Sequence, residues 1–281
     1  MLISKTYMAY PVTLGTAQAK PETPRTNISM NPPYAPTSPP PTQHIASMDP
    51  NTDPPKPQFH SHYDGRFAER ILPNDLRRAH LTDLIRTYLS TMHSIGAETW
   101  IMHGSLLGWF WNRKIMPWDS DVDVQVSERS IAFLADYHNM TIHRFQVGDK
   151  GEGRNYMLEV NPHYKNADKS DYLNVIDARW IDMETGLFID ITALRKDRAA
   201  EEAGEQGRMM CKDQHNYLMS DIFPLRDSVF EGVSVKIPYN YAELLEEEYG
   251  ATALTETEFE NHRFDQQTLE WIPVQRKKYT S

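Results

Sequence analysis

Three aspartates alternate in the segment "PWDSDVDV", at Asp119, Asp121 and Asp123. On a β-strand the side chains of residues i and i+2 share a face and lie roughly 7 Å apart at Cα, so Asp121 and Asp123 can converge on one or two cations. Carboxylates suit Mg²⁺ or Mn²⁺, hard cations that prefer oxygen ligands and keep room for water and substrate phosphates. A solvated strand edge would show the same alternation, so the spacing alone leaves both interpretations open.

Two further features favour a binding site. Gly104 and Ser105 lie between a predicted strand and a predicted helix, where backbone N–H groups and the positive end of the helix can hold a phosphate, although Gly-Ser is also ordinary in a turn. Asp190 lies between Ile189 and Ile191 in an apolar run. Because burying an unpaired carboxylate is costly, Asp190 is either a paired structural charge or a functional group.

The elements around these residues mix helices and strands. Apolar residues at three-and-four spacing predict a helix from Pro73 to near Gly96, capped by Asn74 or Asp75. We also expect strands at 98–102, 122–126, 156–160, 173–182 and 187–194. Further helices are expected at 104–112, at 127–139 with Ser127 as cap, and at 241–250 closed by Gly250. A hairpin is expected at 228–238, and a loop or exposed helix at 195–213. This order predicts an α/β or α+β domain with a mixed β-sheet flanked by helices.

The N-terminal part differs in composition from the rest. Of the 19 prolines, 13 lie between Pro11 and Pro57, among few large apolar residues. Such a segment buries too little apolar surface to offset the entropy lost on ordering. We therefore predict a disordered, proline-rich arm over residues 1–58 and one folded domain over residues 59–281.

Charge and cysteine content exclude several classes of protein. The arm is close to neutral, so the net charge of −10 belongs to the folded part, which argues against a nucleic-acid-binding protein because that function needs a basic surface. A single cysteine, Cys211, permits no internal disulfide and no cysteine-built zinc site. The acidity is compatible with a cation site.

The motifs together resemble a known family. Gly-Ser, an Asp-x-Asp flanked by apolar residues some fifteen residues later, and a carboxylate on a later strand resemble the nucleotidyltransferase fold of the DNA polymerase β type. More narrowly, "HGSLLGWFWNRKIMPWDSDVDVQV" is similar to the core of the LicD and fukutin family, and "GLFIDITAL" and "FPLRDSVFEGVSVKIPYNYAELLEEEYG" resemble its later segments. The likeness covers about residues 99–250 and is greatest to fungal members related to the yeast mannosylphosphate-transfer protein.

The resemblance implies a reaction and a cofactor. Such enzymes take a CDP- or GDP-linked donor and move its phosphate-linked group, such as mannose phosphate, phosphocholine or a polyol phosphate, onto a glycan hydroxyl. By residue match, Asp121 and Asp123 are expected to be catalytic ligands of Mg²⁺ or Mn²⁺, with Asp190 as a further ligand or the general base. Gly104 and Ser105 are expected to hold the donor phosphate.

Other residues near the acids have two interpretations each. Arg113 and Lys114 could add positive charge to the donor phosphates or be solvated loop residues. Asp119 also matches an acid of the family. It lies at the entry of the predicted strand, where its role would be to form a cap or to orient neighbouring groups. The tryptophans could stack on a base or sugar or belong to the core: Trp109, Trp111 and Trp118. His103 is interpreted as a hydrogen-bonding partner rather than a catalyst, and no role is derived for His215.

Two alternative functions remain at this stage. A nucleotidyltransferase that forms an NDP-linked compound would use the same residues, and a non-catalytic accessory protein could keep the fold while regulating a glycan phosphotransferase. The sequence has no apolar stretch of about 18 residues, so we expect a soluble chain as written, with no membrane span. The family implies the Golgi or secretory lumen and an N-terminal anchor, so either an anchor is missing from this chain or it acts on a cytosolic acceptor.

Overall fold

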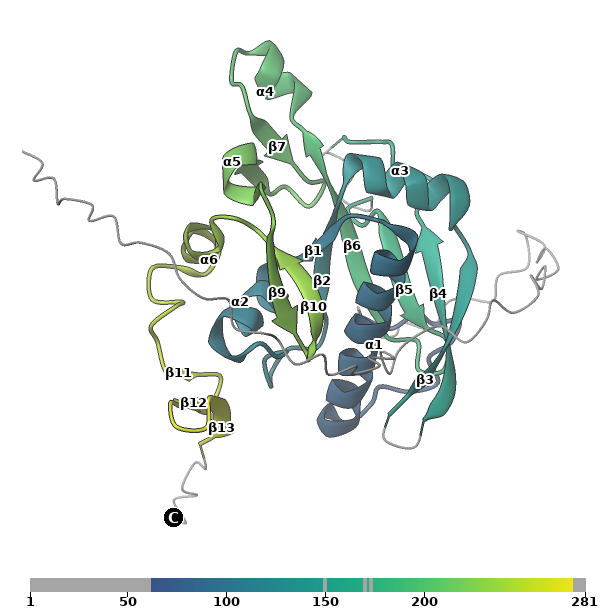
Figure 1. The fold of residues 1–281 in the computed structure, drawn as a ribbon, viewed down its shortest axis with the longest axis vertical. Helices are drawn as coiled ribbons and strands as arrows, with labels where there is room; N and C mark the ends of the chain where they lie inside the picture. The colour runs from purple at the N-terminus through teal and green to yellow at the C-terminus, as the bar shows by residue number, and fades with distance from the viewer. Residues whose placement is uncertain (1–61, 149–150, 169–170, 172–173, 275–281) are drawn as a thin grey trace, which may run out of the picture. The chain divides into compact units, whose positions relative to one another are not determined.

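The computed structural model describes residues 62–148, 151–168, 171 and 174–274 (Figure 1). The predicted arm over residues 1–58 lies outside the described residues. In the described part of the chain, no helix is long and apolar enough to cross a membrane.

A mixed β-sheet forms the centre of the fold. Its strands follow the order β1-β2-β6-β5-β4-β3, in which β2 and β6 are parallel and the other neighbours are antiparallel. Their bounds are β1 Thr99–Ile101, β2 Asp123–Ser127, β3 Thr141–Val147, β4 Glu152–Val160, β5 Ala178–Asp182 and β6 Phe188–Lys196. Two short strands extend the sheet beyond the end of β6: β7 Arg208–Met210 and β8 Asn216–Leu218. The predicted mixed sheet flanked by helices is confirmed.

The two faces of this sheet differ. Alternate apolar residues, among them Trp180, Ile189 and Ile191, enter the main core, to which helices α1 (Asn74–Ile95) and α3 (Glu128–Tyr137) contribute their apolar sides. Their sequence neighbours point the opposite way, so Asp190 and Arg179 belong to the other face. Figure 1 shows α1 running across the sheet beside β5 and β6.

The end of α1 and the start of α3 agree with the sequence prediction, whereas the start of α1 differs from it. Ser127 caps α3, since its side chain accepts a hydrogen bond from the Ser130 N–H, and Gly96 ends α1 in the left-handed region at φ 73°. The predicted cap of α1 was wrong. Asn74 is already helical, and Pro73 takes the cap position without a side-chain bond, at φ −56° and ψ 150°, since its fixed φ is compatible with the extended conformation of a cap residue.

Helix α2 (His103–Asn112) packs closely on the chain that follows it. A Cβ at Gly108 would collide with the backbone carbonyl of Lys114, so only glycine permits this approach. Trp109 is buried in the main core, whereas Trp111 and Trp118 pack against a second cluster that contains Trp271. All three tryptophans therefore contribute to packing.

The sequence missed several strands. The edge strand β3 is one of them, because only Phe145 and Val147 of its residues are buried and its alternation is weak. Residues 195–213 contain the end of β6, helix α4 (Arg198–Glu202) and β7, rather than only a loop or helix. A small C-terminal sheet was also missed: β11 Glu258–Phe259, β12 His262–Asp265 and β13 Glu270–Pro273.

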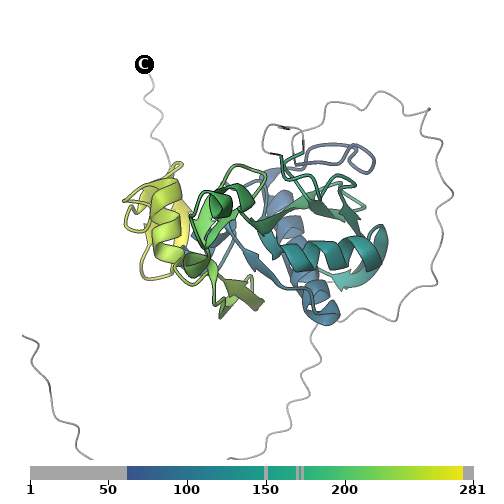
Figure 2. The ribbon, with the colours of Figure 1, turned by 90° about the horizontal axis from the view of Figure 1, so that it is seen from above.

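The remaining elements lie outside the main sheet. The predicted hairpin is confirmed as β9 (Arg226–Phe230) and β10 (Val233–Ile237), and the predicted last helix is α6 (Tyr241–Tyr249), which Gly250 follows. A short helix, α5 (Met219–Ile222), precedes the hairpin. In Figure 2, α6 (yellow-green) and α3 (teal) lie toward opposite ends of the domain.

Candidate active site

Two predicted acids lie side by side on neighbouring strands. Asp123 begins β2 and Asp190 lies in β6, and the two are Cα partners across the parallel pair. The next pair in the register, Val124 and Ile191, is buried in the main core. Asp123 and Asp190 therefore share the face that the core helices leave uncovered, with their strands roughly 5 Å apart.

Asp121 does not lie on a strand, contrary to the prediction. Strand β2 begins only at Asp123, and Asp121 belongs to the irregular segment before it, where His62 Nδ1 lies 3.4 Å from its Oδ2 atom. A position in a loop gives this carboxylate more freedom than a strand would. Its charge nevertheless reaches Asp119, Asp123 and Asp190, since it raises the pKa of each of them.

The first turn of α2 lies against these acids. A Cβ added at Gly104 would lie 3.4 Å from Asp119 Oδ2 and 3.9 Å from the Tyr249 hydroxyl oxygen, in ordinary van der Waals contact, so these two groups are close neighbours of Gly104. Ser105 is buried, and its hydroxyl oxygen accepts a hydrogen bond of 3.0 Å from the Asp123 N–H. Gly104 and Ser105 are thus at the helix start where a phosphate site was predicted, and Ser105 also positions Asp123.

Arg113 and Lys114 lie away from that helix start. Arg113 is the C-cap of α2, a helix about 15 Å long. Its guanidinium group lies 3.9 Å above the Trp109 ring and donates to the Trp109 carbonyl, while Lys114 pairs with Glu270 of β13. The helix therefore places Arg113 and Lys114 at the opposite end of α2 from Gly104, which favours the alternative interpretation of both as loop residues.

The acids form an electrostatically strained cluster. Burial, and after it the charge of Asp121, raises the pKa of Asp119 to about 7 and that of Asp123 to about 8. Burial also raises the pKa of Asp190 to about 6, against the lowering effect of Arg179. The Asp190 Oδ1 atom is buried without a hydrogen-bond partner. A divalent cation would satisfy these groups, so the residues fit the predicted metal.

The three carboxylates are neighbours, but their oxygen atoms do not converge on one position. Within the described residues, the oxygens of Asp121, Asp123 and Asp190 do not form a set of three within 4.8 Å of one another. Like charges repel, so carboxylates that share a site stay apart until a cation lies between them.

The sequence did not identify Arg179 as part of this site. Arg179 of β5 is the Cα partner of Asp190, and its Nε atom lies 3.8 Å from Asp190 Oδ1. On its other side it is paired in register with Glu159 of β4. A row of charged residues therefore crosses four strands on the face opposite the main core: Asp123, Asp190, Arg179 and Glu159. This row results from the register of strands that are far apart in the sequence, so no local sequence pattern predicts it.

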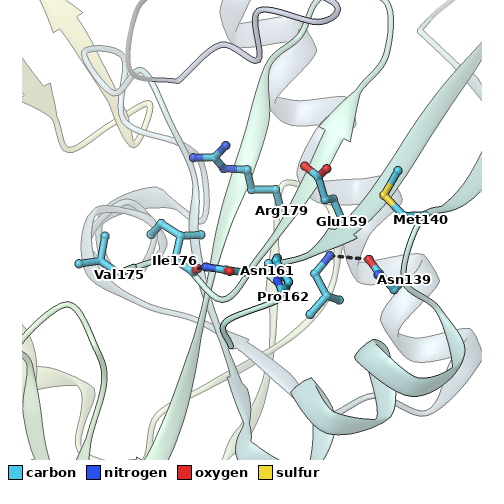
Figure 3. A pocket seen from close by; sticks show the side chains of 10 residues that line it. Asn139, Met140, Glu159, Asn161, Pro162, Val175, Ile176 and Arg179 are labelled. Carbon is cyan, nitrogen blue, oxygen red and sulfur yellow. Dashed lines mark hydrogen bonds between the residues drawn. The ribbon is translucent and has the colours of Figure 1, made fainter. Parts of the chain in front are cut away.

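The row leads into a cavity of about 540 Å³. Arg179 and Glu159 line it together with the asparagines Asn161 and Asn139 and with apolar side chains, Met140 and Ile176 among them. In Figure 3 the Arg179 and Glu159 side chains point the same way from their neighbouring strands. The acids and the cavity are thus connected through Arg179, which belongs to both.

The part of the chain that contains this site is similar to known proteins. Residues 96–240 match the LicD/FKTN/FKRP nucleotidyltransferase domain. The chain is 36% identical over 141 residues to mannosyltransferase regulator 4 of Saccharomyces cerevisiae, which covers 49% of this chain and 12% of that protein. It is 33% identical over 137 residues to mannosyltransferase regulator 14 of the same yeast, and this match covers 47% of this chain and 14% of that protein. The matched segment is therefore a small part of each relative.

The matched range contains the helix start at Gly104 and the acids of β2 and β6, on the mixed sheet that the resemblance led us to expect. The chain belongs to the LicD/FKTN/FKRP family of nucleotidyltransferase domains.

Proposed function

We propose that this protein is a metal-dependent transferase that moves a phosphate-linked group, such as mannose phosphate, phosphocholine or a polyol phosphate, from a CDP- or GDP-linked donor to a glycan hydroxyl. The observation that carries the proposal is the pairing of Asp123 and Asp190 on the sheet face opposite the main core, beside the start of α2. The family and the names of the yeast relatives support a role in glycan modification.

The proposed roles follow from the positions of the side chains. Asp121, Asp123 and Asp190 would hold Mg²⁺ or Mn²⁺, which when bound neutralises pyrophosphate charge and favours deprotonation of the acceptor hydroxyl. Asp190, with its unpartnered Oδ1 atom and raised pKa, is placed either as a ligand or to accept the hydroxyl proton. The acceptor oxygen then attacks phosphorus, and a nucleoside monophosphate leaves.

The start of α2 is the proposed donor phosphate site. Its first N–H groups lack a side-chain cap, and Gly104 offers no Cβ to block a phosphate. Asp119 lies on the same approach, so its negative charge would repel a phosphate unless a cation or a proton neutralises it. This arrangement favours metal-bound donor over free nucleotide.

Arg179→Ala is expected to lower kcat/KM for transfer by about 10-fold to 100-fold. Its guanidinium offers charged hydrogen bonds to an anionic substrate beside Asp190, and such bonds contribute about 1.5–3 kcal/mol. Steady-state release of nucleoside monophosphate measures the effect, and Arg179→Lys should restore part of it. Arg208→Ala, which removes an exposed arginine of β7, is the control. An Arg179→Ala enzyme that matches this control would exclude Arg179 from the site.

The proposal is tested by incubating the purified protein with Mg²⁺ or Mn²⁺, a mannan acceptor, and CDP-choline, CDP-ribitol, CDP-glycerol or GDP-mannose in turn. We expect release of CMP or GMP that requires metal, acceptor and Asp121, with Asp121→Ala as the negative control. Formation of an NDP-linked compound from an NTP would instead support a nucleotidyltransferase.

A second candidate function is favoured by one observation, the word "regulator" in the names of both yeast relatives. An accessory protein would keep the fold without turning over a donor. If no donor is consumed and calorimetry detects no binding of Mg²⁺ or Mn²⁺, the transferase proposal fails and the accessory role replaces it.

A further inference from the structure

Three side chains from distant parts of the chain meet beside the start of α2. His103 is the first residue of α2, and Asp213 and His215 lie in the turn between β7 and β8. The ligand atoms of these three residues lie within 4.8 Å of one another. His103 Nε2 is 3.8 Å from Asp213 Oδ2, and His215 Nδ1 is 3.2 Å from Asp213 Oδ1. We refer to these three residues as the histidine site.

In both imidazoles of the histidine site, the nitrogen that faces Asp213 is shielded from water and makes no hydrogen bond. His103 Nε2 and His215 Nδ1 are buried atoms without a hydrogen-bond partner. Buried polar atoms are rarely left without a partner in native proteins, so each such atom requires an explanation. Both atoms face the Asp213 carboxylate, and a ligand held between the three residues would satisfy both of them.

Glu248 of α6 orients His103. Its Oε1 atom lies 2.8 Å from His103 Nδ1. With the proton on Nδ1, which donates to Glu248, the lone pair of Nε2 is directed to Asp213. A carboxylate that binds the second nitrogen of a histidine in this way is the usual support of a metal-bound imidazole. The same carboxylate adds negative charge around the site, which favours a cation.

The backbone and surface of the histidine site are consistent with a ligand. His103 has φ 52°, in the left-handed region that residues other than glycine seldom adopt. The rings of His103 and His215 lie 4.5 Å apart, so both nitrogens are held near one point. The His215 side chain is 41% exposed, which leaves a path for an ion from solvent.

We propose that His103, Asp213 and His215 bind a divalent transition-metal cation of the Zn²⁺ type. Two imidazole nitrogens and one carboxylate are a ligand set that suits Zn²⁺ and leaves a fourth position for water or substrate. Mg²⁺ prefers oxygen ligands throughout, so this site differs in chemistry from the aspartates of β2 and β6. Because His103 directly precedes Gly104, the cation would place positive charge beside the proposed donor phosphate site.

Metal binding to the purified full chain tests this proposal without any measurement of activity. Co²⁺ is titrated while its visible absorption is recorded, and Zn²⁺ is then added in competition. We expect one strongly absorbing Co²⁺ per chain, in a nitrogen-containing, low-coordinate environment, displaced by Zn²⁺; Co²⁺ at the aspartates of β2 and β6 would be six-coordinate and absorb weakly. His215→Ala and His215→Gln should weaken binding by at least about 100-fold, and Glu248→Gln by about 10-fold to 100-fold.

Two controls make the result specific. His93→Ala removes an exposed histidine of α1 and should leave Co²⁺ binding unchanged. Asp190→Asn should also retain Co²⁺ binding, because Asp190 lies outside the histidine site. The proposal is overturned if both His215 variants, with far-UV circular dichroism like the wild type, bind Co²⁺ as the wild type does, or if binding is lost in Asp190→Asn. Failure of the transferase proposal would leave this outcome unaffected.

Discussion

Asp123→Asn is expected to reduce metal-dependent transfer by about 10³-fold or more while leaving the chain folded. The amide keeps the shape of the side chain but removes the charge that would bind a cation beside Asp190. Charge stabilisation by a bound metal amounts to several kcal/mol, and each 1.36 kcal/mol is a factor of about ten in rate. Initial rates of nucleoside monophosphate release measure the loss.

The same substitution should not destabilise the metal-free protein. The pKa of Asp123 is raised to about 8 in the folded state by burial and by neighbouring aspartates. A raised pKa favours the folded protein at low pH, and this contribution is lost as the pH rises through about 8. The uncharged amide of the variant avoids that loss, so at pH 8 without metal the variant should unfold at the same temperature as the wild type or a higher one.

The control for both measurements is Asp136→Asn, which changes an exposed aspartate of α3 and should alter neither rate nor unfolding temperature. Two results would argue against the proposed role of Asp123. One is a rate equal to that of the control. The other is a clear fall in unfolding temperature at pH 8, which would show that Asp123 stabilises the fold rather than serving as a ligand.

Asp177→Ala is expected to destabilise the protein by about 3–5 kcal/mol, the range found when one partner of a buried ion pair is removed. Asp177 is fully buried and lies 2.8 Å from Arg195 Nη2 and 2.9 Å from Lys212 Nζ. It also accepts a hydrogen bond of 2.8 Å from the Ala193 N–H in β6. The substitution leaves two buried cations without their carboxylate.

Urea unfolding followed by circular dichroism measures this change. The matched control is Asp227→Ala, which breaks the exposed ion pair with Lys236 and should cost no more than about 1 kcal/mol. Asp177→Asn should fall between the two, because an amide still accepts hydrogen bonds. If Asp177→Ala and Asp227→Ala unfold at the same urea concentration, the buried network does not stabilise the fold.

Local patterns of the sequence were sufficient for much of the fold. The three-and-four spacing predicted α1, and the cap at Ser127 and the closing Gly250 predicted the start of α3 and the end of α6. These features depend on residues within one or two turns of each other, so a linear pattern records them. Weakly alternating pieces such as β3 were missed because pairing with β4, rather than local preference, makes them strands.

For the site, the sequence determined the residue types and the tertiary structure decided which of them meet. Gly104, Asp123 and Asp190 could be singled out because they interrupt or end apolar segments. Three features could not be read from the sequence. Asp121 lies in a loop, Arg113 and Lys114 lie at the far end of α2, and Arg179 pairs with Asp190. The meeting of His103 with Asp213 and His215 also depends on packing between distant segments. The buried core as a whole sets the register of the strands and the direction of the helices. Register and direction in turn determine which charged side chains meet at the site.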